Sequence, residues 1–384
     1  PYTEQHNHER GVLWTALVPG ERALLEVVVP RAQQPYLRLQ LSSVQQGYRD
    51  IFKASLPDPN KAGSCNVDTV CTEGNNWRDQ IQSVGRYTFV KQGTGRLCTG
   101  QLINRTSADR APLFLTANHC LDTQTEAESV VLYWNYQSAT CRTVGSAANG
   151  QSLPISLATH TQSGASLLAT YAPSDFTLLR LSQPVPNAAN PYWTGWDRRD
   201  LAPAAVTAIH HPQGHEKRIS FENDPLSISS YLGATGSGTT HLRVADWDLG
   251  TTEGGSSGSG IWNADKRLVG QLHGGNAACG NDLPDWYGRL AVSWAGGGTA
   301  ATRLSDHLDP AGSAPQFLDG VAGCTAPTAT INASVDPVPA GSDVLYVVNA
   351  SGGSGSGYSY AWDVEGDGVI DRSGSNNSLS VRYD

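Results

Sequence analysis

A run of glycine and serine at residues 254–260 lies directly before a strand-like segment, and it constrains the fold more than any other feature. Glycine and serine are common in flexible linkers. Here Ile261 and Trp262 follow the run at once, and the apolar segment 268–272 comes soon after; both are typical of strands. A flexible linker has no place between such segments, so we interpret the run as an ordered loop of a β-sheet.

The chain supplies a histidine, an aspartate and a serine, in that order, in segments suited to nucleophilic catalysis. His119 follows the strand-like residues 113–115, Asp175 precedes the apolar run 176–181, and Ser257 lies in the glycine-serine run. A serine hydroxyl is a weak nucleophile until an imidazole takes its proton and a carboxylate orients that imidazole. The sequence therefore predicts His119 as general base, Asp175 as its orienting carboxylate and Ser257 as nucleophile.

The glycines favour Ser257 over Ser256 and Ser259 as the nucleophile. An oxyanion hole needs backbone N–H groups aimed at one point, and a side chain there would obstruct the substrate. With Ser257 as nucleophile, the N–H groups of Gly255 and Ser257 converge in this way, and Gly255 permits an unusual backbone conformation. We predict these two amides as the oxyanion hole.

The motifs around these residues extend over about residues 64–321. They are Ser-Cys-Asn-Val-Asp at 64–68, Ala-Asn-His-Cys at 117–120, Val-Leu-Tyr-Trp-Asn-Tyr-Gln at 131–137, Ser-Asp-Phe-Thr-Leu-Leu at 174–179, Gly-Trp-Asp-Arg-Arg-Asp at 195–200, Ile-His-His-Pro at 209–212, Glu-Lys-Arg-Ile-Ser at 216–220, Thr-His-Leu at 240–242, Gly-Gln-Leu-His-Gly-Gly at 270–275 and Tyr-Gly-Arg at 287–289. In these motifs the chain resembles the chymotrypsin-fold serine endopeptidases, and among them the bacterial lysyl endopeptidases.

The resemblance implies further residues that select the substrate. Asp285 stands where the family carries the carboxylate at the base of its primary pocket, and His273 matches a histidine beside the active site. A buried carboxylate favours a cationic side chain, because an unpaired buried charge is costly. The alternative for Asp285 is a solvated loop residue, and for His273 a hydrogen-bonded structural residue.

The chain also departs from the family pattern. The pocket tryptophan upstream of Thr-His-Leu has no clear equivalent, and Tyr231 lies one residue away from its place. Tyr231 would substitute for it by aromatic packing against the imidazole or against the alkyl stem of the substrate. Gly254 and Gly260 stand where the family has prolines around the nucleophile. These departures bear on the preference for lysine over arginine.

Seven cysteines are present, and six of them lie in the region of the resemblance. An even set of cysteines in an extracellular type of protein indicates disulfides, and six cysteines allow 15 pairings. Metal binding is the alternative, but the chain has no Cys-x-x-Cys pair to hold zinc. The resemblance implies the pairs Cys65–Cys279, Cys71–Cys141 and Cys98–Cys120. Cys324 is left over, and we expect no metal and no cofactor.

Composition limits the function classes. The 384 residues carry a formal net charge of −9, which argues against a nucleic-acid-binding protein. No run of 18 apolar residues is present, so no transmembrane helix is expected. The 41 glycines and 21 prolines favour many short strands and turns.

Three regions follow from the patterning. Residues 1–61 are expected to be a β-rich remnant of a pro-region, with strands over 11–15, 23–29 and 36–41, and residues 62–323 a chymotrypsin-like serine protease domain. Residues 324–384 resemble the start of a PKD domain, an immunoglobulin-like sandwich. Such a sandwich needs about seven strands, so we expect it to be truncated. Because the chain starts at Pro1 and lacks methionine, we also expect a signal and more pro-region upstream.

The sequence thus predicts a mainly β protein with a chymotrypsin-like double β-barrel. The predicted function is a secreted, monomeric serine endopeptidase that cuts protein or peptide substrates after lysine, made as a zymogen, with no nucleic-acid or membrane partner. The alternatives are a trypsin-like protease that cuts after arginine and lysine, and a non-catalytic binding protein built on a protease fold.

Maturation is predicted to occur after Lys61, just before Ala62-Gly63-Ser64-Cys65, where the family's mature chain begins. A lysine-specific enzyme would perform this cleavage itself. N-terminal sequencing of the secreted form is expected to begin at Ala62. A start well away from Ala62 would make Lys61 an ordinary linker residue.

Overall fold

The computed structural model describes residues 11–18, 22–47, 62–146, 159–323, 325–335, 339–353 and 358–383. The chain divides into two compact units, Pro1–Ala322 and Gly323–Asp384. The division falls one residue before the predicted end of the protease domain at residue 323. The described N-terminal residues, 11–18 and 22–47, belong to the larger unit.

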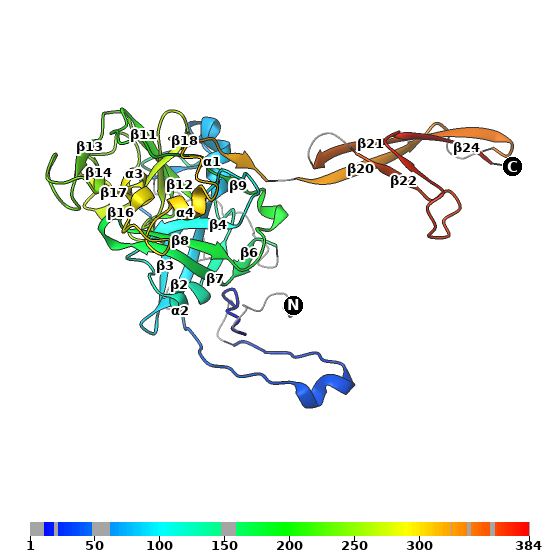
Figure 1. Ribbon diagram of the computed structural model, residues 1–384, viewed down its shortest axis with the longest axis horizontal. Coiled ribbons are helices and arrows are strands. Elements are labelled where there is room, and N and C mark those ends of the chain that lie inside the picture. Colours follow the sequence, from blue (N-terminus) through cyan, green and yellow to red (C-terminus); the bar gives the residue numbers. More distant parts are fainter. Residues whose placement is uncertain are drawn as a thin grey trace. The chain divides into compact units, whose positions relative to one another are not determined.

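Seven antiparallel strands form the first sheet of the larger unit (Figure 1). In spatial order they are β6 (Thr161–Ser163), β5 (Val131–Tyr133), β2 (Val84–Lys91), β3 (Thr94–Leu102), β4 (Leu113–Ala117), β8 (Phe176–Leu181) and β7 (Ala165–Tyr171). All five residues of β4 are buried, which explains why its sequence is a continuous apolar run without alternation. The predicted strands around residues 113–115 and 176–181 are thus confirmed as β4 and β8.

Ten strands form the second sheet, which carries the glycine-serine run. Its main path is β1 (Val67–Asp68), β12 (Arg218–Glu222), β11 (Val206–His210), β15 (Gly260–Trp262), β16 (Leu268–Gly275), β17 (Asp285–Arg289), β14 (His241–Val244) and β13 (Ser227–Ser229). Strand β10 (Trp196–Asp197) pairs with β16 and with β18 (Phe317–Leu318). Strands β19 (Val321–Ala322) and β9 (Tyr192–Trp193) form a separate pair. Residues 254–259 connect to β15 as an ordered turn, as the sequence predicts.

Both sheets contribute to one hydrophobic core. Leu115 and Phe176 of the first sheet belong to the same buried cluster as Ile209 and Trp262 of the second. Burial of each large apolar side chain stabilises the fold by about 1.5–3 kcal/mol. The indole N–H of Trp262 is also satisfied, because it donates to Thr194 Oγ1 at 2.7 Å. The shared core therefore fixes one sheet against the other.

Helices are short in the described residues. The α-helices are α1 (Arg78–Ser83), α2 (Gln124–Glu128), α3 (Leu290–Ala295) and α4 (Ser305–Leu308), and the 3-10 helices are η2 (Arg31–Tyr36), η3 (Thr72–Trp77), η4 (Ala172–Ser174), η5 (Asn187–Ala189) and η6 (Pro212–Gly214). None of the helices in the described ranges is long and apolar enough to cross a membrane.

The strands predicted for the N-terminal region are wrong. Residues 11–18 and 22–47 contain no strand, and 31–36 form a 3-10 helix. A strand needs a neighbour to satisfy its N–H and C=O groups, and a periodic pattern cannot supply one. Leu24 and Val28 are 93% and 84% exposed, so this segment buries no apolar face. The segment 14–17 packs against Val131 and Tyr133 of the first sheet, and the Leu17 N–H donates to the Tyr133 hydroxyl at 3.1 Å.

The smaller unit contains five strands in its described residues. Strands β20 (Thr325–Ala333), β21 (Ser342–Gly353) and β24 (Ser378–Tyr383) form one sheet, and β22 (Tyr360–Trp362) pairs with β23 (Arg372–Gly374). Val344, Val348 and Leu379 are buried in it. The PKD-like assignment of this unit stays a prediction.

Three disulfides are present in the larger unit, and they are the pairings that the resemblance implies: Cys65–Cys279, Cys71–Cys141 and Cys98–Cys120. Cys65–Cys279 joins positions 214 residues apart. Cross-links of this kind stabilise a fold mainly by constraining the unfolded chain. Cys324 lies outside the described residues.

Candidate active site

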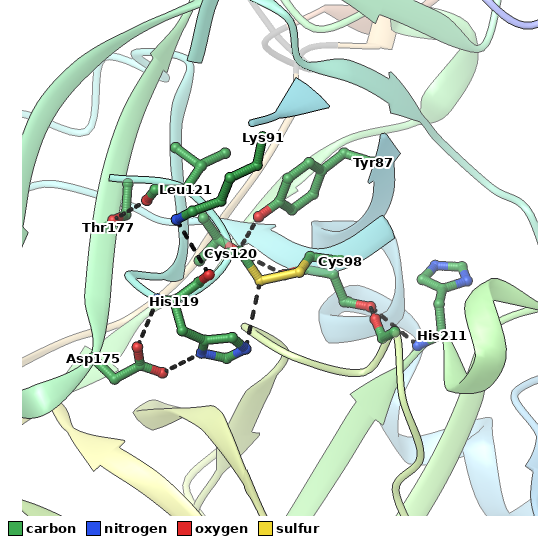
Figure 2. The surroundings of a disulfide bond; sticks show 12 residues. Tyr87, Lys91, Cys98, His119, Cys120, Leu121, Asp175, Thr177 and His211 are labelled. Carbon is green, nitrogen blue, oxygen red and sulfur yellow. Dashed lines mark hydrogen bonds and ion pairs between the residues drawn. A yellow bond between two sulfur atoms is a disulfide. The ribbon is translucent and has the colours of Figure 1, made fainter. Parts of the chain in front are cut away.

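His119 and Asp175 form a hydrogen-bonded pair at the ends of neighbouring strands. His119 Nδ1 lies 2.9 Å from Asp175 Oδ2, and the backbone N–H of His119 donates to Asp175 Oδ1 at 2.8 Å (Figure 2). The Asp175 residue is 1% exposed, whereas the His119 side chain is 37% exposed. The buried carboxylate occupies Nδ1, and the other ring nitrogen, Nε2, lies 3.9 Å from the sulfur of Cys120. A general base held in this way acts through Nε2.

The backbone around Asp175 explains why a carboxylate stands there. Asp175 follows η4 with φ of 53°, a left-handed conformation that aspartate tolerates better than most residues. The preceding carbonyl of Ser174 accepts a hydrogen bond from Gln271 Nε2 at 2.7 Å, and Gln271 belongs to β16 of the second sheet. The approach of Gly288 to this carbonyl is too close for any side chain. The second sheet thus holds the turn that carries Asp175.

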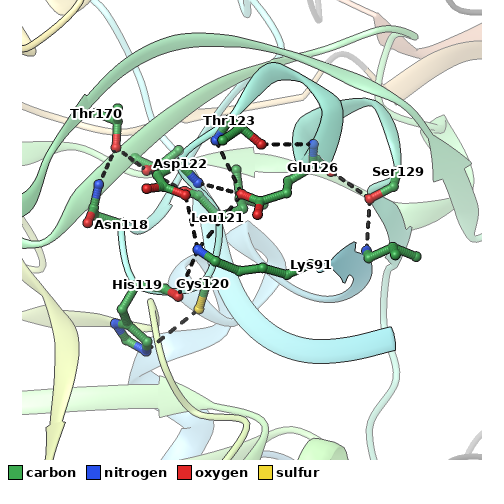
Figure 3. A network of polar contacts seen from close by, with 12 residues as sticks. Lys91, Asn118, His119, Cys120, Leu121, Asp122, Thr123, Glu126, Ser129 and Thr170 are labelled. Atoms are coloured by element: carbon green, nitrogen blue, oxygen red, sulfur yellow. Dashed lines mark hydrogen bonds and ion pairs between the residues drawn. The ribbon is translucent and has the colours of Figure 1, made fainter. Parts of the chain in front are cut away.

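The segment after His119 is fixed by a disulfide and by a lysine. Cys120 is bonded to Cys98 of β3. Lys91 Nζ donates to the His119 carbonyl at 3.4 Å and to Asp122 Oδ1 at 3.0 Å (Figure 3). The side chains of Thr123 and Glu126 form a capping box at the start of α2. These contacts keep the backbone of His119 in place from its C-terminal side.

Ser257 differs from the two serines beside it in being accessible. Ser256 and Ser259 are fully buried, and Ser256 Oγ is held by His210 Nδ1 at 2.8 Å. Ser257 is half-buried, and its carbonyl accepts the N–H of Thr99 at 2.9 Å. A nucleophile must reach the substrate, so accessibility favours Ser257 on a ground independent of the glycine pattern.

Gly258 brings the Ser257 loop against the strand that leads to His119. It has φ of +83°, and a Cβ at this position would stand 2.4 Å from the Thr99 carbonyl oxygen and 2.9 Å from the Ala117 nitrogen. Only glycine permits this approach. Because Ala117 precedes His119 by two residues, the contact brings the backbone beside Ser257 close to the backbone that leads into His119.

The loop leaves two amides free at the predicted oxyanion hole. The N–H groups of Ser256, Gly258 and Ser259 donate to backbone carbonyls within the larger unit. In the described part of the chain, the N–H groups of Gly255 and Ser257 have no such acceptor. Gly255 has φ of +92°, and a Cβ there would lie 2.7 Å from the Gly214 nitrogen. Two unused donors beside an accessible serine fit an oxyanion-binding role.

Aromatic rings extend from His119 across the second sheet. The His273 ring stacks on that of His119, with centroids 5.3 Å apart, and Tyr231 stacks on His273 at 3.5 Å. His241 Nε2 lies 3.0 Å from His273 Nδ1. Burial, reinforced by the neighbouring His273, lowers the pKa of His241 to about 4, so His241 is neutral in neutral solution. Burial also lowers the pKa of His273.

Asp285 begins β17 and is buried, not solvated. The residue is 1% exposed, and its Oδ2 accepts hydrogen bonds from Trp247 Nε1 at 2.8 Å and from Thr252 Oγ1 at 2.7 Å. Burial raises the pKa of this carboxyl, and the hydrogen bonds from Trp247, from Thr252 and from the backbone N–H of Ala277 oppose the rise. Among the described residues, no lysine or arginine forms an ion pair with Asp285. The alternative of a solvated loop aspartate is therefore wrong.

Within the described ranges, two groups of side chains have the composition of a metal site. The first is His119, Asp175 and His273. Here the two imidazole rings lie nearly parallel, at 14°, and Asp175 Oδ2 already binds His119, so the nitrogen lone pairs do not converge on one point. The second group is Glu222, Asp224 and Asp248, and it shares no residue with the first.

The sequence did not predict the residues that hydrogen-bond to the side chains of Asp285 and His273. Trp247 and Thr252 hold Asp285, and His241 holds His273. Thr-His-Leu at 240–242 marks His241 only as part of a family motif, and no local pattern marks Trp247 or Thr252. The predicted cleavage site Lys61 lies outside the described residues.

The comparisons with known proteins agree on the class of protein. The family model described as "Lysyl endopeptidase, C-terminal domain" matches residues 59–288, more than half of the chain. The lysyl endopeptidase of Pseudomonas aeruginosa is 32% identical over 286 residues, which cover 70% of this chain and 58% of that protein. The chain thus spans just over half the length of this curated relative.

Solved structures of proteases are also similar to the chain. The protease Anisep of Arthrobacter nicotinovorans has a TM-score of 0.35 at 13% identity, covering 54% of this chain and 90% of that one. An HtrA-type protease solved with a tripeptide has a TM-score of 0.39 at 13% identity, covering 74% of this chain and 97% of that one.

Substitution of two glycines in one loop tests the role of Gly258. Gly258→Ala forces a Cβ against the Thr99 carbonyl in a left-handed backbone, so we expect a loss of about 3 kcal/mol in the free energy of unfolding, measured in urea. Gly254→Ala is the matched control, because a Cβ there meets no atom within 4 Å, and its effect should stay within about 0.5 kcal/mol. Equal effects of the two substitutions would contradict the close approach.

Proposed function

The chain belongs to the lysyl endopeptidase C-terminal domain family, and on that basis we propose that it is a secreted serine endopeptidase that cuts on the carboxyl side of lysine. Family membership supports the reaction class, and the His119–Asp175 pair supports the mechanism. The observation that carries the proposal furthest is the buried Asp285, whose hydrogen-bond partners are neutral. The three disulfides of the chain suit an oxidising, extracellular environment.

Each residue has a defined part in the proposed reaction. Ser257 Oγ attacks the scissile carbonyl while His119 Nε2 takes its proton, and His119 then gives that proton to the leaving amine. Asp175 holds the tautomer with the proton on Nδ1 and stabilises the imidazolium that forms. The N–H groups of Gly255 and Ser257 bind the oxyanion. Water then hydrolyses the acyl-enzyme by the same steps, and no cofactor is needed.

Specificity arises from the charge of Asp285. A carboxylate taken out of water is costly, and hydrogen bonds from Trp247 and Thr252 offset only part of that cost. The ammonium group of a lysine substrate would neutralise the carboxylate and offset the rest of this cost, whereas a neutral side chain would not. A glutamate side chain would be repelled. Tyr231 and His273 form an aromatic wall beside this site, suited to the alkyl stem of lysine.

The proposal extends to the architecture. We assign the two sheets to the two barrels of a chymotrypsin-like fold, with the site between them, and residues 1–61 to a pro-region removed after Lys61. The second unit is proposed to be a truncated PKD-like module. The protease is proposed to act as a monomer.

One alternative has a specific observation in its favour. Asp285 would pair with arginine as well as with lysine, and the family's pocket tryptophan has no clear equivalent in this chain. A trypsin-like enzyme that cuts after both residues is therefore the second candidate. A binding protein without activity is less well supported, because it would not need an accessible Ser257 beside free amides.

Matched chromogenic peptides ending in Lys, Arg and Glu test the reaction and its specificity together. After removal of residues 1–61, we expect cleavage of the Lys peptide, and Ser257→Ala should lower kcat by at least about 10⁴-fold because the nucleophile is lost. Ser256→Ala is not a suitable control, since Ser256 is bonded to His210. Equal cleavage after Lys and Arg would favour the trypsin-like candidate, and no cleavage at all would favour the binding protein.

Asp285→Asn tests the origin of the lysine preference. The substitution keeps the size of the side chain and one acceptor oxygen for the hydrogen bonds from Trp247 and Thr252 but removes the charge, so kcat/KM for the Lys peptide should fall about 100-fold or more. Asp282→Asn, an equal change of charge at an exposed position of the preceding loop, should change kcat/KM less than about 2-fold. An unchanged kcat/KM in Asp285→Asn would remove Asp285 from the pocket.

A further inference from the structure

A second group of carboxylates lies at the end of β12, away from the residues assigned to catalysis. One oxygen from each of Glu222, Asp224 and Asp248 lies within 4.8 Å of the other two. Glu222 is the last residue of β12, and Asp224 follows it in a bend. Asp248 comes from the distant segment 245–252. Phe221 and Leu249 exchange two backbone hydrogen bonds, at 2.9 and 3.2 Å, and these place Asp248 beside Glu222.

Glu222 is the most buried residue of this group, and its hydrogen bonding is incomplete. It is 2% exposed, and its Oε2 atom is buried with no hydrogen-bond partner in the described structure. Its other oxygen, Oε1, accepts the N–H of Asp224 at 2.8 Å. A buried carboxylate oxygen without a partner costs a large part of its hydration free energy.

The surroundings of Glu222 make this cost larger. The charged groups that act on Glu222 are Asp248, Asp246 and Asp224, all of them negative. Like charges held this close repel one another unless a cation is shared between them. Asp248 Oδ2 is held by the N–H and the side-chain amide of Asn223, which leaves Oδ1 available.

We propose that Glu222, Asp224 and Asp248 form a binding site for a divalent cation of the calcium class. Carboxylate oxygens are the ligands that hard cations prefer, and calcium tolerates the irregular arrangement and the additional water ligands that three carboxylates on two segments imply. Calcium is favoured over magnesium, which demands near-ideal octahedral geometry. The unpartnered Oε2 of Glu222 then becomes a ligand, and the three negative charges are compensated.

The site would also stabilise the segment behind the proposed specificity pocket. Residues 245–252 carry Asp248 and, on either side of it, Trp247 and Thr252, which both donate to Asp285. A cation that joins Asp248 to β12 would restrain this segment. The site itself does not rest on the proposed function, because it is defined by binding alone.

Calcium binding to the full chain, first stripped with a chelator, tests the proposal without any substrate. Titration with calcium in a calorimeter is expected to give a Kd on the order of 10⁻⁴–10⁻³ M. Terbium, a luminescent substitute for calcium, should show emission sensitised by the adjacent Trp247. The thermal midpoint should rise by about 5 °C at saturating calcium.

Two substitutions assign the binding to this site. Asp248→Asn and Glu222→Gln keep the shape of the side chains, and each should weaken calcium binding at least about 10-fold and abolish most of the thermal shift. Asp282→Asn should leave both unchanged. If the unsubstituted chain does not bind calcium, or if both variants bind it as well as Asp282→Asn does, the proposal is overturned; Glu222 would then be a buried, protonated carboxyl.

Discussion

The hydrogen-bonded pair of Asp175 and His119 is the interaction on which the rest of the site depends. Both carboxylate oxygens bind His119, one through the ring and one through the backbone N–H. The pair lies at the ends of β4 and β8 in the first sheet, but the turn that carries Asp175 is held by Gln271 of the second sheet. The geometry of the candidate site therefore depends on contacts from both packed sheets.

Buried negative charge is the second feature that organises the larger unit. Asp175, Asp285 and Glu222 are all at most 2% exposed, and each is compensated in a different way. Asp175 is bound to His119, Asp285 accepts hydrogen bonds from Trp247 and Thr252, and one oxygen of Glu222 has no partner. The incomplete compensation of the last two underlies the two proposals, a lysine side chain at Asp285 and a divalent cation at Glu222.

The sequence predicted much of this arrangement where local chemistry determines it. The glycines at 255 and 258 indicate a loop whose backbone approaches its neighbours closely. In the structure both glycines have the positive φ that glycine permits. The apolar runs at 113–115 and 176–181 are strands because a strand buried on both faces needs no alternation. The resemblance indicated Asp285 as a candidate pocket carboxylate. Composition and periodicity alone would have made it an ordinary loop residue.

Other features depend on long-range contacts that a local pattern does not contain. The apolar residues 23–29 look like a strand, yet no neighbouring strand in the described structure pairs with them. Trp247 supports Asp285 only because β14 and β17 bring segments about 40 residues apart together. The cluster of Glu222 and Asp248 arises from the contact between Phe221 and Leu249, and it was not predicted.

The central claim is that Ser257 is the activated nucleophile beside His119. The most direct measurement is reaction of the matured chain with a fluorophosphonate, followed by mass-spectrometric mapping of the modified residue. The account predicts a single adduct on Ser257. An adduct on Ser256, Ser259 or a serine outside the loop, or no adduct at all, would contradict it.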